Sequence, residues 1–150
     1  MSSAVAVANG ATYEIDLESA SDTNTYSKII SGAGSFLKSG PGQLTFDQVH
    51  TYTGPTTISD GILTMSGSGS FSDSTALTVD NGATYNLGSN EEVSSIAGSG
   101  TIGLGSFTLT SGGYNTNTTF SGTVDGTGGR TKSGTGKLSL TGVKSFTGNT

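Results

Sequence analysis

The feature that most constrains this chain is an internal repeat. Laid without a gap over residues 120–150, residues 26–56 agree at twelve of thirty-one positions. The matching residues are Ser27, Gly32, Gly34, Lys38, Ser39, Gly40, Gly42, Leu44, Val49, Thr53, Gly54 and Thr56. A second match joins residues 4–13 to residues 76–85 at seven of ten positions. Since units of a few tens of residues stack into solenoids, the chain is predicted to be an elongated repeat protein.

The two matches lie at different separations along the chain: residues 4–13 and 76–85 are 72 residues apart, whereas residues 26–56 and 120–150 are 94 apart. We therefore expect repeat copies at roughly residues 4–65 and 76–150, the second with one extra coil within residues 88–118. An inserted whole coil should leave the facing of every other rung unchanged. The second copy stops part way through a unit, so residues 1–150 are interpreted as a single β-helix segment of a longer solenoid.

The apolar residues fall in short alternating groups between glycine-bearing turns, about one group every ten residues. Tyr13, Ile15 and Leu17 share one strand face, for example, while residues 19–27 are polar and are expected to form a loop. Strands with two or three inward residues suit the sides of a narrow coil. No window has the apolar spacing and caps of an α-helix. The fold class is predicted to be all-β, a parallel β-helix of about six or seven coils.

Composition excludes several classes of protein. Only 31% of the residues are hydrophobic and 11% charged, with 25 glycines, but the regular alternation argues against disorder. The chain has no cysteine, so it can form neither disulfides nor thiolate metal sites. The net charge of −5 argues against a nucleic-acid partner, and no apolar run is long enough to insert into a membrane. Residues 1–7 lack a signal-peptide pattern, so export information lies elsewhere or the chain stays inside the cell.

A known family carries the same motif. Gly-x-Gly-x-x-x-Lys-x-Gly-x-Gly-x-Leu, then Tyr/Phe-Thr-Gly-x-Thr and Gly-x-Leu-Thr, occurs at residues 32–64 and in shortened form at 126–150. It resembles the passenger-associated strand repeat of bacterial autotransporters, and residues 77–102 resemble the stretches between such repeats. The resemblance implies a right-handed parallel β-helix, a longer parent with a signal and a translocator barrel, and a location at the cell surface or outside a Gram-negative bacterium.

His50, the only histidine, lies three residues from Asp47 and could suggest a general base. The equivalent positions in the second copy are Lys144 and Thr141, and no nucleophile accompanies the pair. We interpret His50 as part of a surface turn.

Glu14, Asp16 and Glu18 share one strand face at a spacing that could hold calcium. No calcium-binding repeat accompanies them, so a solvated strand face is the preferred interpretation and calcium binding is left open. Glu91 and Glu92 are expected in a solvated loop. No catalytic, cofactor-binding or metal-binding residue is assigned.

The Gly-x-Gly segments lack the context of a phosphate-binding loop and are assigned to turns. Lys38 and Lys132 occupy equivalent positions and are expected to be solvated, as are the other cations near the C-terminal end, Arg130, Lys137 and Lys144. The aromatic pairs Tyr13 with Tyr85 and Tyr52 with Phe146 could be sugar-binding platforms, but interior ladders are preferred. Irregular threonine spacing argues against ice binding.

Together these features predict a non-catalytic scaffold of an autotransporter passenger, either adhesin-like or stalk-forming, and not an enzyme. Its partners would be adjacent coils of a longer parent chain and, beyond them, host or other cell surfaces. A β-helix enzyme acting on polysaccharides, with Asp47 or Glu14 as candidate residues, and a non-catalytic part of an enzyme-bearing passenger remain alternatives. Leu44 and Leu138 are expected to face the core.

Overall fold

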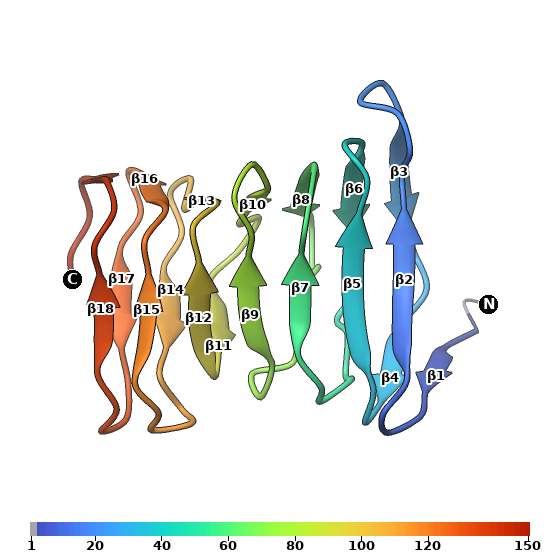
Figure 1. Ribbon diagram of the computed structural model, residues 1–150, viewed down its shortest axis with the longest axis horizontal. Helices are drawn as coiled ribbons and strands as arrows, with labels where there is room; N and C mark the ends of the chain where they lie inside the picture. Colours follow the sequence, from blue (N-terminus) through green and yellow to red (C-terminus); the bar gives the residue numbers. More distant parts are fainter. Residues whose placement is uncertain (1–2) are drawn as a thin grey trace.

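The structure, a computed structural model, describes residues 3–150; Met1 and Ser2, which began the stretch tested for a signal peptide, lie outside the described residues. Every regular element in the described part of the chain is a β-strand. The strands pair in parallel and stack along one axis, with the first coil at one end and the last coil at the other (Figure 1). The predicted parallel β-helix is confirmed, as is its size of about seven coils.

Two sheets of seven parallel strands run the length of the solenoid. The first sheet contains β2 (Thr12–Asp16), β5 (Ser35–Ser39), β7 (Thr56–Ile58), β9 (Ala76–Val79), β12 (Ser95–Gly98), β15 (Thr118–Phe120) and β18 (Leu138–Leu140). The second sheet contains β3 (Thr23–Tyr26), β6 (Gln43–Phe46), β8 (Ile62–Met65), β10 (Thr84–Asn86), β13 (Thr101–Gly103), β16 (Thr123–Gly126) and β19 (Lys144–Phe146).

The third face of the coil is interrupted. One end has the pair β1 (Val5–Val7) and β4 (Ile30–Gly32), and the other has β11 (Glu91–Val93), β14 (Leu109–Ser111) and β17 (Arg130–Lys132). Between them the chain makes only an isolated parallel bridge from Val49 to Ser70. The third face is therefore the irregular side of the solenoid.

The register shows how the coils stack. Tyr13 pairs with Phe36, Phe36 with Thr56, and Thr56 with Leu77, so one coil takes about 20 residues. Alternate residues of each strand face inward, where apolar side chains form one continuous core. Glycines stand where coils approach closely; a Cβ on Gly54, for example, would lie 2.3 Å from the carbonyl oxygen of Gly34.

The polar stretch expected as a loop at residues 19–27 contains β3, which pairs with β6 from Thr23 with Gln43 to Tyr26 with Phe46. The alternation of apolar residues could not reveal this strand, because its first three residues, 23–25, are polar and exposed and only Tyr26 packs against the core. Leu44 is fully buried, whereas Leu138 is only half-buried in the last coil.

The facing of the repeat copies differs from our expectation. The motif around Lys38 lies on β5 of the first sheet, but its counterpart around Lys132 lies on β17 of the third face. Likewise residues 12–16 form β2 of the first sheet, while the matching segment contains β10 of the second. The copies are rotated about the axis, because strands on all three faces share the same inward alternation and the motif specifies a strand and turn, not a face.

Within residues 3–150 the structure contains no helix of the length and apolarity needed to cross a membrane.

Candidate functional site

His50 lies in the core, so the expectation of a surface turn is wrong. Only 1% of the residue is exposed, and its ring packs 4.0 Å, centroid to centroid, from the ring of Phe46. Asp47, the proposed partner, instead accepts a hydrogen bond of 2.7 Å from the hydroxyl of Ser27. Burial lowers the pKa of His50 to about 4, an effect only partly opposed by the charge of Asp47. The imidazole is therefore neutral near pH 7.

The third face shows what His50 does. On most coils the N–H of the inward residue donates to a carbonyl one coil further on. These bonds are Val5 to Ile29, His50 to Ser70, Glu91 to Thr108, Leu109 to Gly129 and Arg130 to Asn149. At Ile30 the N–H instead donates to His50 Nδ1 at 3.1 Å. The imidazole thus replaces a backbone acceptor where the strand ladder is interrupted.

Glu91 makes the same substitution two coils later. The N–H of Phe71 donates to Glu91 Oε1 at 2.9 Å. Glu91 lies in β11 and is 4% exposed, so the expectation of a solvated loop is wrong for Glu91, while its neighbour Glu92 is exposed. Burial raises the pKa of Glu91 to about 8, although the bond from Phe71 opposes the shift. The carboxyl group is consequently mostly protonated at pH 7.

Three buried hydroxyl groups, those of Tyr52, Thr56 and Thr75, bond to one another in the core. The Tyr52 hydroxyl bonds to Thr56, whose Oγ1 lies 2.8 Å from Oγ1 of Thr75, and Thr75 donates to the carbonyl of Gly54 at 2.8 Å. Tyr52 is fully buried, as is Tyr85. Both tyrosines lie inside the solenoid, as expected for interior aromatics, and neither can serve as an outer platform for a sugar ring.

The expectation that Lys38 is solvated is also wrong. It is fully buried, and burial lowers its pKa. Its Nζ donates to the carbonyls of Ser39 and Gly40, both at 2.7 Å, and to that of Asp60 at 3.2 Å. The ammonium group thereby joins its own turn to the turn of the next coil.

The counterpart Lys132 is half-buried and repeats part of this arrangement. Its Nζ donates to the carbonyls of Ser133 and Gly134. Gly40 and Gly134 both adopt positive φ, at 70° and 65°, which a glycine tolerates without strain. The Lys-Ser-Gly motif is therefore a local turn in which the lysine satisfies the carbonyls, on whichever face it falls.

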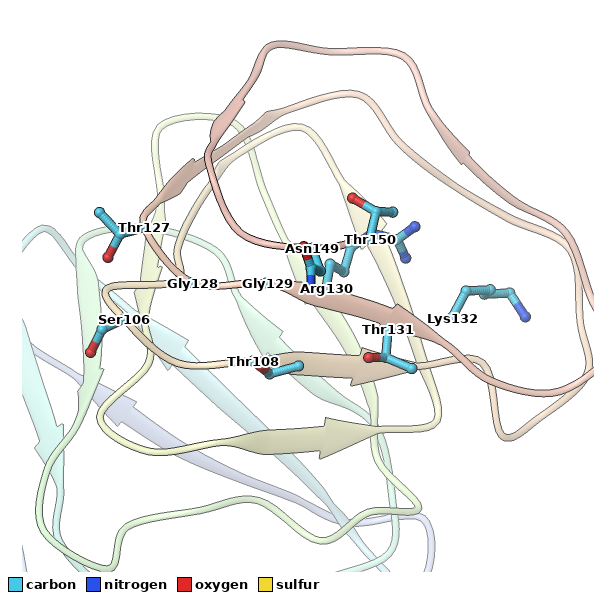
Figure 2. A pocket seen from close by; sticks show the side chains of 10 residues that line it. All are labelled: Ser106, Thr108, Thr127, Gly128, Gly129, Arg130, Thr131, Lys132, Asn149 and Thr150. Atoms are coloured by element: carbon cyan, nitrogen blue, oxygen red, sulfur yellow. The ribbon is translucent and has the colours of Figure 1, made fainter.

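Arg130 borders a hollow of about 590 Å³. The expectation that Arg130 is solvated is wrong, because only 7% of it is exposed. Figure 2 shows its side chain extending from β17 toward Thr150, while Thr131 points to the opposite side of the strand. The hollow is lined by Ser106, Thr108, Thr127, Gly128, Gly129, Arg130, Thr131, Lys132, Asn149 and Thr150. Its lining is cationic and rich in hydroxyl groups.

The carboxylates of β2 face outward, as expected, and Glu14, Asp16 and Glu18 are exposed. Glu14 accepts a hydrogen bond of 2.5 Å from the hydroxyl of Ser39 on the neighbouring strand. Nowhere among residues 3–150 do three or more His, Cys, Asp or Glu side chains gather into a metal-binding group.

Comparison with known proteins agrees with this geometry. A family model described as Passenger-associated-transport-repeat matches residues 36–65 and 131–150. The adhesin BmaC autotransporter of Brucella suis biovar 1 (strain 1330) is 37% identical over 149 residues, which cover 94% of this chain and 4% of that protein. The chain is an autotransporter passenger segment. It belongs at the surface or in the surroundings of a Gram-negative bacterium. No solved structure matches it.

Several polar residues of the passenger segment are buried although the sequence led us to expect them in solvent. For one of them, Arg130, the repeat alignment could have indicated the buried position. In the repeat alignment Arg130 takes the position of Phe36, an inward aromatic residue that is 1% exposed. The alignment therefore already placed Arg130 inside. For His50 and Glu91 no comparable signal existed, because the missing ladder bonds of the third face are invisible in the sequence.

Proposed function

We propose that the passenger segment is a non-catalytic structural scaffold, adhesin-like or stalk-forming, that holds its outer surface away from the cell. The observation that carries this proposal is the pair of unbroken seven-stranded parallel sheets extending along the whole segment. Each coil provides hydrogen-bond partners for the backbone of the next coil, so coils can be added without any loss of local stability. A relative of 37% identity is named an adhesin, which favours a role in attachment.

The buried ionisable groups support a structural role. His50 and Glu91 accept backbone hydrogen bonds, and Lys38 donates to turn carbonyls. Glu91 also borders an open hollow of about 440 Å³ with Thr108 and Thr110, but its Oε1 already accepts the N–H of Phe71. The chemistry of the three ionisable groups is used within the fold.

The two carboxylates named as candidates for the enzyme alternative, Glu14 and Asp47, do not form a paired site. Glu14 lies on the outer face of β2 and bonds to Ser39, whereas Asp47 follows β6 and bonds to Ser27. Glycoside hydrolysis needs two carboxyl groups on either side of one bond, less than about 10 Å apart. The two residues belong to different sheets of the solenoid.

Incubation of the purified segment with a panel of acidic and neutral polysaccharides tests the non-catalytic role. We expect no increase in reducing ends or unsaturated products. Cleavage by the native chain that disappears in Asp47→Asn or Glu14→Gln would overturn the proposal in favour of the enzyme.

Attachment is tested separately with beads that carry the segment. We expect beads with the folded segment to bind host cells better than beads with the Leu44→Asp variant, whose core is disrupted. Equal binding by both would contradict an adhesin-like surface and leave the stalk role.

A further inference from the structure

The corner between the first and second sheets is longer in the coil of β9 and β10 than in the coils on either side. Four residues, 80–83, connect these two strands, whereas three, 59–61, connect β7 to β8 and two, 99–100, connect β12 to β13. The extra length carries Asn81 and Gly82, and both are exposed. The corner lies in the middle of the solenoid, with coils stacked on both sides of it (Figure 1).

The backbone of this corner leaves the Gly82 N–H exposed and unbonded. The N–H of Ala83 donates to the carbonyl of Asp80 at 3.0 Å, which closes a turn with Gly82 at a φ of 90°. Within the described residues 3–150, neither the Gly82 N–H nor the side-chain amide of Asn81 forms a hydrogen bond. A side-chain amide that nothing holds thus comes directly before a backbone N–H that nothing holds.

The corner of the preceding coil shows the opposite arrangement. There the N–H of Gly61 donates to Asp60 Oδ1 at 2.7 Å, and Gly61 is buried. A Cβ on Gly61 would lie 2.4 Å from the carbonyl oxygen of Gly42, whereas a Cβ on Gly82 would meet no atom within 4 Å. The two corners therefore differ both in hydrogen bonding and in the space around the glycine.

An asparagine followed by a glycine can form a cyclic imide without an enzyme, and asparagine is among the thermolabile residues for this reason. The Gly82 nitrogen would lose its proton to hydroxide and attack Cγ of Asn81, whose Nδ2 takes a proton from water and leaves as ammonia. Water then opens the ring at either carbonyl, which gives aspartate or β-linked isoaspartate at position 81. Glycine favours the attack because it has no Cβ beside the forming ring.

We propose that Asn81 is a site of spontaneous deamidation in the folded segment, with water as the only co-reactant. Conversion adds a carboxylate next to Asp80 at an exposed corner, and the β-linked form lengthens the turn by one backbone carbon. The space beside Gly82 accommodates this carbon. The modification is independent of the scaffold role, since it changes one outer corner and leaves both sheets intact.

The variant Asp60→Asn provides a matched control, because it creates a second asparagine-glycine pair in the tight corner of the same chain. The variant is incubated at pH 7.5, folded and in urea, and the peptides containing positions 60 and 81 are followed by mass spectrometry with electron-transfer fragmentation. In urea we expect the two positions to convert at similar rates. In the folded chain, position 81 should convert at least tenfold faster than position 60.

The proposal is overturned if Asn81 persists in the folded chain while it converts in urea, or if folding slows conversion equally at positions 60 and 81. The native chain, once converted at position 81, should keep a cooperative thermal transition, as should Asn81→Gln, which does not convert. Loss of that transition on conversion alone would overturn the claim that the corner accepts the longer turn.

Discussion

Glu91→Gln should alter how the stability of the segment depends on pH. The pKa of Glu91 is raised from its ordinary 4.5 to about 8 in the fold. Below pH 4.5 both folded and unfolded chains hold the proton, so Glu91 adds no pH dependence. Between pH 4.5 and 8 the folded chain binds more protons than the unfolded chain, and stability therefore falls as pH rises. Above pH 8 the full cost of the buried carboxylate is present.

The size of this effect follows from the shift in pKa. One pKa unit corresponds to about 1.4 kcal/mol, so the loss between pH 4.5 and 8 is on the order of 5 kcal/mol. Glutamine keeps an Oε1 atom to accept the N–H of Phe71 but cannot ionise. Glu91→Gln should thus resemble the native chain at pH 5 and be more stable than it by several kcal/mol at pH 9.

Urea unfolding at pH 5, 7 and 9 measures the difference, with Glu92→Gln as the matched control. Glu92 is exposed on the same strand, so its substitution should shift the free energy of unfolding equally at every pH. Parallel pH profiles for Glu91→Gln and the native chain would refute the reasoning.

Three further outcomes are expected. The pKa of His50 is lowered to about 4, so the free energy of unfolding should fall as pH falls from 6.5 to 4, because the unfolded chain binds a proton that the folded chain does not. Urea unfolding of His50→Gln should lack this loss. Lys38→Met leaves turn carbonyls without their donor and should lower the free energy of unfolding in urea by about 1–3 kcal/mol, more than Lys132→Met does. An equal or smaller loss for Lys38→Met would contradict the role of the buried Lys38 in joining the two turns. Leu44→Asp should abolish cooperative thermal unfolding, whereas Thr45→Asp on the outer face of β6 should retain it, and a cooperative transition in Leu44→Asp would count against the inward facing.

Much of the fold could be predicted from the sequence because its signals are local. Leu44 alternates with polar neighbours between glycine turns, so its inward facing follows from the period of a strand. The internal repeat predicts that similar coils stack on one another, and its spacing indicates the length of each coil. Neither signal specifies which face of the coil a unit occupies, since all three faces have the same alternation. The rotation between the copies therefore emerges only from the strand pairing.

The polar interior was harder to predict because charge alone suggests exposure. Lys38 lies on the inward side of its strand, but its ammonium reaches backbone carbonyls that no sequence pattern reveals. His50 and Glu91 are buried because two N–H groups of the third face lack a carbonyl partner. Arg130 aligns with Phe36, whose side chain points inward. The alignment therefore indicated a buried position, but we predicted exposure because arginine is charged.

The central claim is that stacked, interchangeable coils hold the segment together, and a pair of deletions differing by one residue tests it most directly. Thr57 pairs with Thr78, so deleting residues 57–77 removes one coil and keeps every inward residue inward. Deleting residues 57–76 instead brings Leu77 to the outward position of Thr57 and inverts the alternation. Thermal unfolding followed by circular dichroism should show a cooperative β-sheet transition for the first deletion and none for the second. Loss of the transition in both, or its retention in both, would contradict the account.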